Sequence, residues 1–257
     1  LVLAALPCWQ RLDADTYRAR VAEMVDDIER DTIARHRRAE AVPKGATSQD
    51  VVDTALVLSL REASNLIDTR LAGLDEALTE LEARFGNAPL MGRTRMQAAL
   101  PVTVADRLRA WRAPLAAHLA DLPRVMDRVA HVQIGGAVGL RDAPQGQAEA
   151  VAHHVANSLG LGCGSVWHTD RSRIIELGQW LALVSGALGK MGQDIALMAQ
   201  NEVGEVTLSG GGTSSAMPHK NNPVLAESLV TLARFNAVQV SGMHHALVHE
   251  NERSGSA

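Results

Sequence analysis

The residues best suited to chemistry lie in one segment, residues 213–223, which reads Thr-Ser-Ser-Ala-Met-Pro-His-Lys-Asn-Asn-Pro. Its lysine and asparagine offer fixed positive charge and hydrogen-bond donors close to two hydroxyl groups, and such groups stabilise negative charge in a transition state. Glycines at 210–212 can serve as a hinge for closure. Pro223 is well placed to open a helix whose positive N-terminal end would face the segment. On composition alone, a solvated Ser/Gly-rich surface turn is the alternative.

The fixed positions Ser-Ser-x-Met-Pro-x-Lys-x-Asn-Pro of this segment resemble the signature loop of the fumarase/aspartase superfamily. The resemblance implies an enzyme that adds or removes a proton on the carbon beside a carboxylate, with Ser214 as the catalytic proton-transfer residue. Ser215, Lys220 and Asn222 would bind the substrate and stabilise its aci-carboxylate form. A serine alkoxide is a costly base in water, so this role requires a closed, dry loop. Thr213 stands where the family usually has glycine.

A second segment, residues 45–54, resembles another region of the superfamily, with the pattern Gly-x-Thr-Ser-x-Asp-x-x-Asp-Thr. Thr47 and Ser48 would present hydroxyl and N–H groups at a helix N-terminus, which favours a substrate carboxylate. An ordinary helix cap would use the same residues. Pro43 stands where family members usually have a histidine, so any role of that histidine is absent.

A third segment, residues 92–97, reads Gly-Arg-Thr-Arg-Met-Gln and resembles the region in which Arg93, Thr94 and Arg95 would bind substrate. Lyases such as adenylosuccinate lyase usually have histidine at the position of Arg95. An arginine does not act as an acid or base near neutrality, but it pairs bidentately with a carboxylate. We therefore expect a substrate that carries several carboxylates.

Further likenesses favour the branch of 3-carboxy-cis,cis-muconate cycloisomerases, and they lie at residues 167–169, 188–195 and 252–255. In that branch one carboxylate of a tricarboxylate attacks a double bond, and the enzyme protonates the neighbouring carbon, which gives 4-carboxymuconolactone in protocatechuate degradation. The resemblance adds His168 and Arg253 to the substrate-binding residues and requires no cofactor and no metal. Two alternatives stay open because family histidines are absent at 43, 95 and 251: a C–N lyase of the adenylosuccinate lyase type, and an inactive structural or interaction member.

Helical periodicity dominates the elements that must position these segments. Apolar residues step by threes and fours from 67 to 85, and a regular heptad seam runs from 174 to 198. Such a seam is typical of a long helix in a near-parallel bundle. The sequence therefore predicts an all-α fold, and the resemblance implies a long-helix bundle of the fumarase/aspartase type.

Helix-breaking residues and polar stretches indicate where the remaining helices and loops lie. Helices are predicted around 102–131, 145–160 and 224–248, with loops at 86–101, 133–145 and 201–223. Pro114 and Pro123 predict a kink or break in the first of these helices. No alternation typical of a β-strand stands out. We expect residues 1–44 to form a partial N-terminal helical region and residues 45–257 a central bundle domain that is incomplete at its C-terminus, since both ends look cut.

Composition excludes several classes of function. A net charge of −4 over 257 residues does not favour nucleic acid as a partner. No apolar run approaches the ~18 residues that a membrane span requires. Two distant cysteines make a reducing cytoplasm the simpler interpretation. The expected partners are a small polycarboxylate and other copies of the chain, because the resemblance implies a homotetramer whose active sites each gather residues from three subunits.

Overall fold

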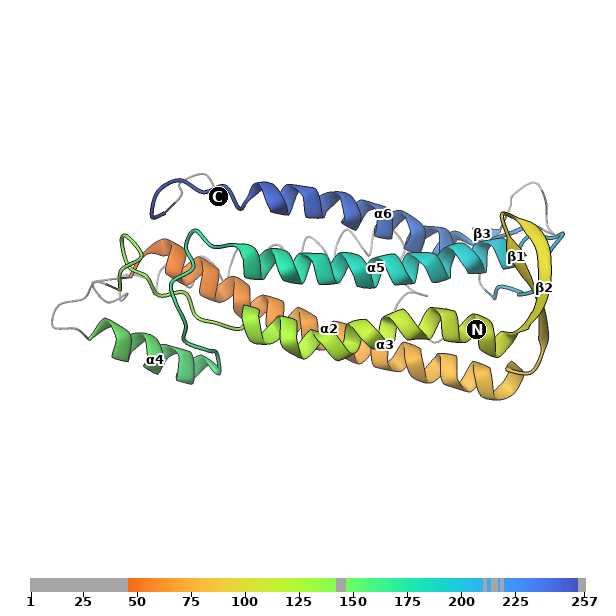
Figure 1. Cartoon of the computed structure of the whole chain (residues 1–257), viewed down its shortest axis with the longest axis horizontal. Coiled ribbons are helices and arrows are strands. Elements are labelled where there is room, and N and C mark those ends of the chain that lie inside the picture. Colours follow the sequence, from red (N-terminus) through yellow and green to blue (C-terminus); the bar gives the residue numbers. More distant parts are fainter. Residues whose placement is uncertain (1–45, 142–146, 210–211, 214–216, 218–219, 254–257) are drawn as a thin grey trace.

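The computed structural model describes residues 46–141, 147–209, 212–213, 217 and 220–253. Among them, four long helices lie side by side in an elongated bundle (Figure 1). These helices are α2 (Ser48–Phe85), α3 (Val104–Val129), α5 (Ser172–Met198) and α6 (Val224–His245). The short helix α4 (Ala148–Leu159) lies at one end, called here the α4 end, and a β-hairpin lies at the other, called the hairpin end. The predicted helical bundle is confirmed, whereas residues 1–44 fall outside the described part of the chain.

Helix α2 begins where its sequence predicts. Thr47 is the N-cap, and its backbone N–H donates to the Asp50 carboxylate at 2.9 Å, which satisfies one of the free donors of the first turn. The predicted apolar face is turned inward, with Leu71, Leu74 and Leu78 buried. The helix ends at Gly86, as expected.

Helix α5 carries the heptad seam into the core. Leu177, Val184 and Met191 are buried along it and pack in the same cluster as residues of α2 and α3. Gly189 and Gly192 let α6 approach α5 closely. A Cβ on Gly192, for example, would lie 2.6 Å from the Ala226 carbonyl oxygen. Because this contact is too close for a side chain, α5 and α6 pack with their backbones near one another.

Helix α3 is continuous, so of the predicted kink or break at its prolines the break is wrong and the kink stays a prediction. Pro114 and Pro123 lie inside the helix, where each removes one backbone hydrogen bond. Buried residues that pack onto α2 and α5 lie before, between and after the two prolines, and this packing offsets the loss. Arg112 adds hydrogen bonds of 2.7 and 3.1 Å to the two carboxylate oxygens of Asp75 on α2. This side-chain hydrogen bonding from Arg112 holds the pKa of Asp75 below its usual range.

Residues 86–101 do not form the simple loop that was predicted for them. They hold β1 (Pro89–Thr94) and most of β2 (Gln97–Thr103), which pair antiparallel. The register shifts between Met91 and Arg93, and most of the residues of both strands are exposed or half-buried. A bulge and the lack of a buried face remove the alternation by which a strand is predicted.

Two shorter features complete the fold. The strands β3 (Gly212–Thr213) and β4 (Asn221–Asn222) pair antiparallel and close the base of the signature segment at the hairpin end. Within the described ranges, no helix is both long enough and apolar enough to cross a membrane.

Replacing Leu78 tests the core. Its side chain is fully buried in the cluster that joins α2, α3 and α5, so Leu78→Ala should lower the free energy of unfolding by about 2–5 kcal/mol through lost burial and a residual cavity. Urea denaturation measures this loss. Leu140→Ala is the control, because Leu140 is 74% exposed and its loss should stay within about 0.5 kcal/mol. Equal losses would contradict the assigned core.

Candidate functional site

The hairpin end presents Arg95 on a strained turn. Thr94 pairs with Gln97, so Arg95 and Met96 alone form the turn, and their φ angles are +48° and +64°. Turns of this kind normally use Asn-Gly, because positive φ costs other residues about 1–2 kcal/mol each. Arg93 and Arg95 of this hairpin line the same hollow as residues of α5. Strain of this kind gathers at functional sites, which supports the predicted importance of this segment.

A hollow of about 340 Å³ lies beneath this turn and gathers positive charge. Its cations define what we call the cationic pocket, and they are Arg93, Arg95, Arg107 and Lys190. Two acidic residues, Asp194 and Glu205, also line it, so the balance favours an anion.

The acidic residues of the cationic pocket hold some of its cations in place. Arg93 Nη1 lies 2.6 Å from Glu205 Oε1, and Arg93 is therefore already paired. Asp194 accepts a hydrogen bond of 2.8 Å from Trp111 Nε1 and also contacts the Lys190 ammonium. Within the described residues, no ion pair holds Arg95, which leaves its guanidinium available to a carboxylate.

The base of the signature segment lies at the hairpin end (Figure 1). Asn222 lies in β4, and the Lys220 backbone N–H donates to the Met217 carbonyl at 3.0 Å. The Lys220 side chain is exposed. Pro223 is the N-cap of α6, as predicted, and its carbonyl accepts the first helical hydrogen bond from Glu227. The predicted catalytic Ser214 and its neighbour Ser215 lie outside the described residues.

The α4 end is organised around the buried carboxylate of Asp50. Oδ1 accepts hydrogen bonds from Gly135 N at 2.8 Å and from His168 Nε2 at 2.8 Å. Oδ2 accepts from Thr47 N at 2.9 Å and from Gly136 N at 3.1 Å. Asp50 is 3% exposed, so this charge is stabilised by its four donors rather than by water.

One helical turn further along, Asp53 anchors a second layer of the same network. Arg171 Nη1 lies 2.8 Å from Asp53 Oδ1, which also accepts from Gln49 Nε2 at 2.7 Å. Gln133 is fully buried, exchanges hydrogen bonds with Thr54, and accepts one from Trp167 N at 3.0 Å. These bonds tie α2 to the two segments that carry Gly135 and His168.

The segment that enters α5 carries an acidic residue, Asp170, two positions before the helix begins. Asp170 accepts a hydrogen bond of 3.0 Å from Ser172 N at the start of α5. Hydrogen bonding from Ser172, foremost from its side chain, lowers the pKa of Asp170. Asp170 therefore places a carboxylate beside this helix N-terminus.

Several buried polar atoms at the α4 end have no hydrogen-bond partner among the described residues, including Thr47 Oγ1, His131 Nδ1 and His168 Nδ1. The chain's tail also comes here, because the Glu252 carbonyl oxygen would lie 3.9 Å from a Cβ on Gly139, next to His168 Nδ1 at 3.8 Å. Arg253 follows it and is exposed. The exposed Ser48 at the N-terminus of α2 suits an anionic ligand.

The predicted substrate-binding residues thus divide into two sets at opposite ends of the bundle (Figure 1). Thr47, Ser48, His168 and Arg253 lie at the α4 end, and Arg93, Thr94, Arg95, Lys220 and Asn222 lie at the hairpin end. The 38 residues of α2 separate the sets by roughly 57 Å. One chain therefore does not bring the two sets together.

Sequence reasoning missed the roles of Asp50 and Asp53. Both belong to the segment of the second resemblance, but only the hydroxyl residues before them were considered. The signal that could have found them is an acidic residue at the third helical position, followed by another one turn later on the same face.

One group of side chains has atoms placed for a metal ion. Ligand atoms of Glu149, His153 and Cys163 lie within 4.8 Å of one another. The carboxylate of Glu149, however, already accepts two hydrogen bonds from Arg141 Nη1, at 2.9 and 2.8 Å. A cation there would have to displace a guanidinium, so this cluster does not extend the candidate site.

The fold is a mostly helical bundle with polar clusters at both ends. A family model described as "Lyase" matches residues 4–242, and the chain belongs to that family. The 3-carboxy-cis,cis-muconate cycloisomerase of Pseudomonas aeruginosa is 40% identical over 236 residues, which cover 90% of this chain and 51% of that protein. The enzyme of the same name from Acinetobacter baylyi is 37% identical over 220 residues, which cover 84% and 49%.

A solved structure agrees with these relatives. The 3-carboxy-cis,cis-muconate lactonizing enzyme from Pseudomonas putida superposes with a TM-score of 0.78 at 35% identity, covering 99% of this chain and 60% of that one. The chain therefore spans about half the length of the relatives that it matches.

Relief of the strained turn provides a test of its geometry. Met96→Gly should raise the free energy of unfolding by about 1 kcal/mol, because glycine adopts positive φ without a Cβ clash. Met96→Ala is the control: it removes the same exposed side chain but keeps the strain, so stability should change by less than about 0.5 kcal/mol. Urea denaturation compares the two variants. Equal effects would show that the turn is not strained.

Proposed function

We propose that this chain is part of a cycloisomerase that converts 3-carboxy-cis,cis-muconate to 4-carboxymuconolactone. The observation that carries the proposal is the likeness, at 37–40% identity over most of this chain, to proteins named for that activity. The complete signature segment and a pocket rich in cations support it, since the substrate carries three carboxylates. A cytoplasmic place in protocatechuate degradation is part of the same proposal.

The proposed reaction needs one proton and no external nucleophile. An oxygen of one substrate carboxylate forms a C–O bond to a double-bond carbon, and the π electrons move to the neighbouring carbon, which lies beside another carboxylate. That carboxylate holds the charge as an aci-carboxylate until the carbon takes a proton. Lys220, Asn222 and Arg95 supply cations and donors for this charge. Ser214 is the proposed proton carrier within the closed segment.

We infer further that other copies of the chain complete each site in a homotetramer. Because α2 keeps the two sets of site residues far apart, a complete site requires the α4 end of one subunit beside the hairpin end of another. Large apolar side chains stand exposed on the outer face of α6, among them Phe235 at 59% and Val238 at 69%. Such contiguous apolar surface is typical of a subunit interface.

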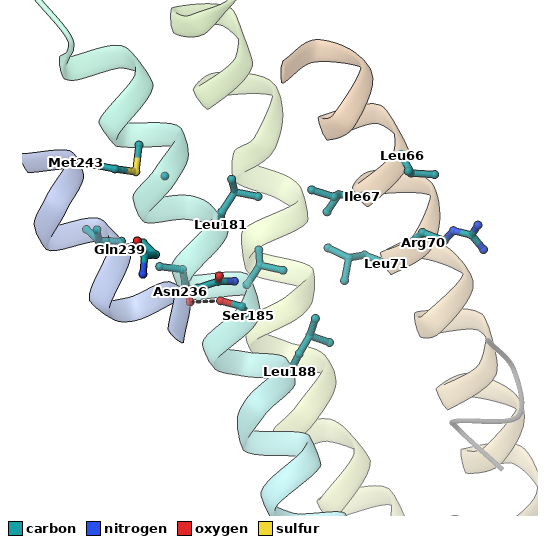
Figure 2. Close-up of a pocket in the computed structure, with 14 residues that line it drawn as sticks. Leu66, Ile67, Arg70, Leu71, Leu181, Ser185, Leu188, Asn236, Gln239 and Met243 are labelled. Carbon is teal, nitrogen blue, oxygen red and sulfur yellow. Dashed lines mark hydrogen bonds between the residues drawn. The ribbon is translucent and has the colours of Figure 1, made fainter. Parts of the chain in front are cut away.

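A groove on the bundle surface supports the same inference. It has a volume of about 470 Å³ and runs between α2, α5 and α6. Figure 2 shows Leu66 and Ile67 on one wall and Gln239 and Met243 on the opposite wall. Leu66 is 57% exposed. An apolar groove of this size along three helices would be filled by side chains of a further helix.

The activity can be measured directly on the protein that contains this chain. Incubation with 3-carboxy-cis,cis-muconate should reduce its ultraviolet absorbance as the conjugated diene is consumed, and Ser214→Ala should lower kcat by about 10²–10⁴-fold. Ser209→Ala, a nearby serine outside the signature segment, should leave kcat unchanged. Turnover of adenylosuccinate alone would overturn the proposed substrate. Activity that Ser214→Ala leaves intact would remove Ser214 from the mechanism.

Mixing two inactive variants tests whether sites are shared. One variant, Thr47→Val/Ser48→Ala, damages the α4 end, and the other, Ser214→Ala, damages the signature segment. Joint unfolding and reassembly should recover about a quarter of wild-type activity, because each site then draws its two groups from different subunits at random. Each variant reassembled alone is the control. Failure to recover activity from correctly sized tetramers, measured by light scattering, would contradict a shared site.

A further inference from the structure

We propose that Asp50 and His168 are positioning residues for the substrate-binding N-terminus of α2, with His168 acting as a fixed hydrogen-bond donor rather than as a proton carrier. The inference rests on the proposed function for its kinetic consequence, but its structural part stands independently. It assigns a role to a buried pair that joins three segments far apart in the sequence.

The hydrogen bond between His168 and Asp50 joins two buried side chains of fixed geometry, and it is called here the tie. The His168 side chain is 1% exposed, and its Nε2 atom lies 2.8 Å from Asp50 Oδ1. Both carboxylate oxygens of Asp50 already accept backbone N–H groups, from Gly135 on one side and from Thr47 and Gly136 on the other. A carboxylate offers only acceptors, so the hydrogen of this contact lies on Nε2.

The second ring nitrogen has no room to exchange protons with a substrate. His168 Nδ1 is buried without a partner, and a Cβ on Gly135 would lie 3.2 Å from it and 2.7 Å from Cε1. The glycine backbone thus packs closely against the ring. Proton transfer needs a partner within hydrogen-bond reach, and the packing around Nδ1 provides none among the described residues.

The tie affects substrate binding through Thr47. Asp50 fixes the Thr47 N–H group, and with it the start of α2, where Thr47 and Ser48 are proposed to meet a carboxylate. The same carboxylate holds the Gly135–Gly136 backbone against this end. Loss of the His168 donor leaves a buried carboxylate one hydrogen bond short, which loosens all of its remaining contacts.

Two substitutions separate positioning from proton transfer. His168→Phe keeps the ring volume and removes the donor, whereas His168→Gln places an amide N–H near the position of Nε2 and has no basic nitrogen. Positioning predicts that His168→Phe raises KM at least about 10-fold with a smaller change in kcat. His168→Gln should restore both values to within about 3-fold of the wild type. His131→Gln, at a half-buried histidine of the same end, is the control and should leave both unchanged.

A measurement without turnover keeps this inference distinct from the proposed function. Hydrogen–deuterium exchange of the full-length protein should quicken in peptides covering 46–54 and 133–141 for His168→Phe and stay at the wild-type rate for His168→Gln. Unchanged exchange in His168→Phe overturns the tie, and equal kinetic losses in both variants overturn the donor role. If the wild type turns over no carboxymuconate while the exchange result holds, the proposed function falls and the tie stands.

Discussion

The continuity of α2 is the constraint on which the rest of the structure depends. A hydrogen-bonded helix rises 1.5 Å per residue, so the 38 residues of α2 hold its two ends roughly 57 Å apart. Packing against α3 and α5 along the buried leucine face prevents it from folding back. The hydroxyl residues at the start of α2 and the arginines that follow its end are therefore far apart in space. Any chemistry that uses both requires a second chain.

The two ends differ in how they are stabilised. At the α4 end, Asp50 and Asp53 are buried and fully supplied with donors, which makes a rigid platform. At the hairpin end, Arg95 and Met96 occupy positive φ, and Glu205 Oε2 is buried without a partner. Strain and unpaired groups are tolerated where geometry serves binding. The α4 end shares these features, since Arg141 has a φ of +49° and His168 Nδ1 is buried without a partner, so the buried, donor-rich carboxylates of Asp50 and Asp53 are what distinguish it.

Much of the bundle could be predicted because the residues that form one face of a helix lie close together in the sequence. The seam of α5, the Thr47 cap and the helix that begins after Pro223 each depend on residues three or four positions apart. The hairpin was missed because its strands bury no continuous face and its turn lacks Asn-Gly. The Asp50 contacts could not be foreseen, since Gly135 and His168 lie 85 and 118 positions away and no local period encodes such a distance.

Arg95 stands where lyases such as adenylosuccinate lyase usually have histidine, and this replacement agrees with the different residue types at the two ends of the bundle. No histidine lines the described part of the cationic pocket, and His168 is locked at the opposite end with its free nitrogen enclosed. A pocket of arginines and a lysine can hold and stabilise negative charge, but it does not carry protons near neutrality. Elimination of an amine requires both a base and an acid for the leaving group, whereas lactone formation needs a single proton delivered to carbon. The residues present at this end therefore match the cycloisomerase reaction better than a C–N lyase.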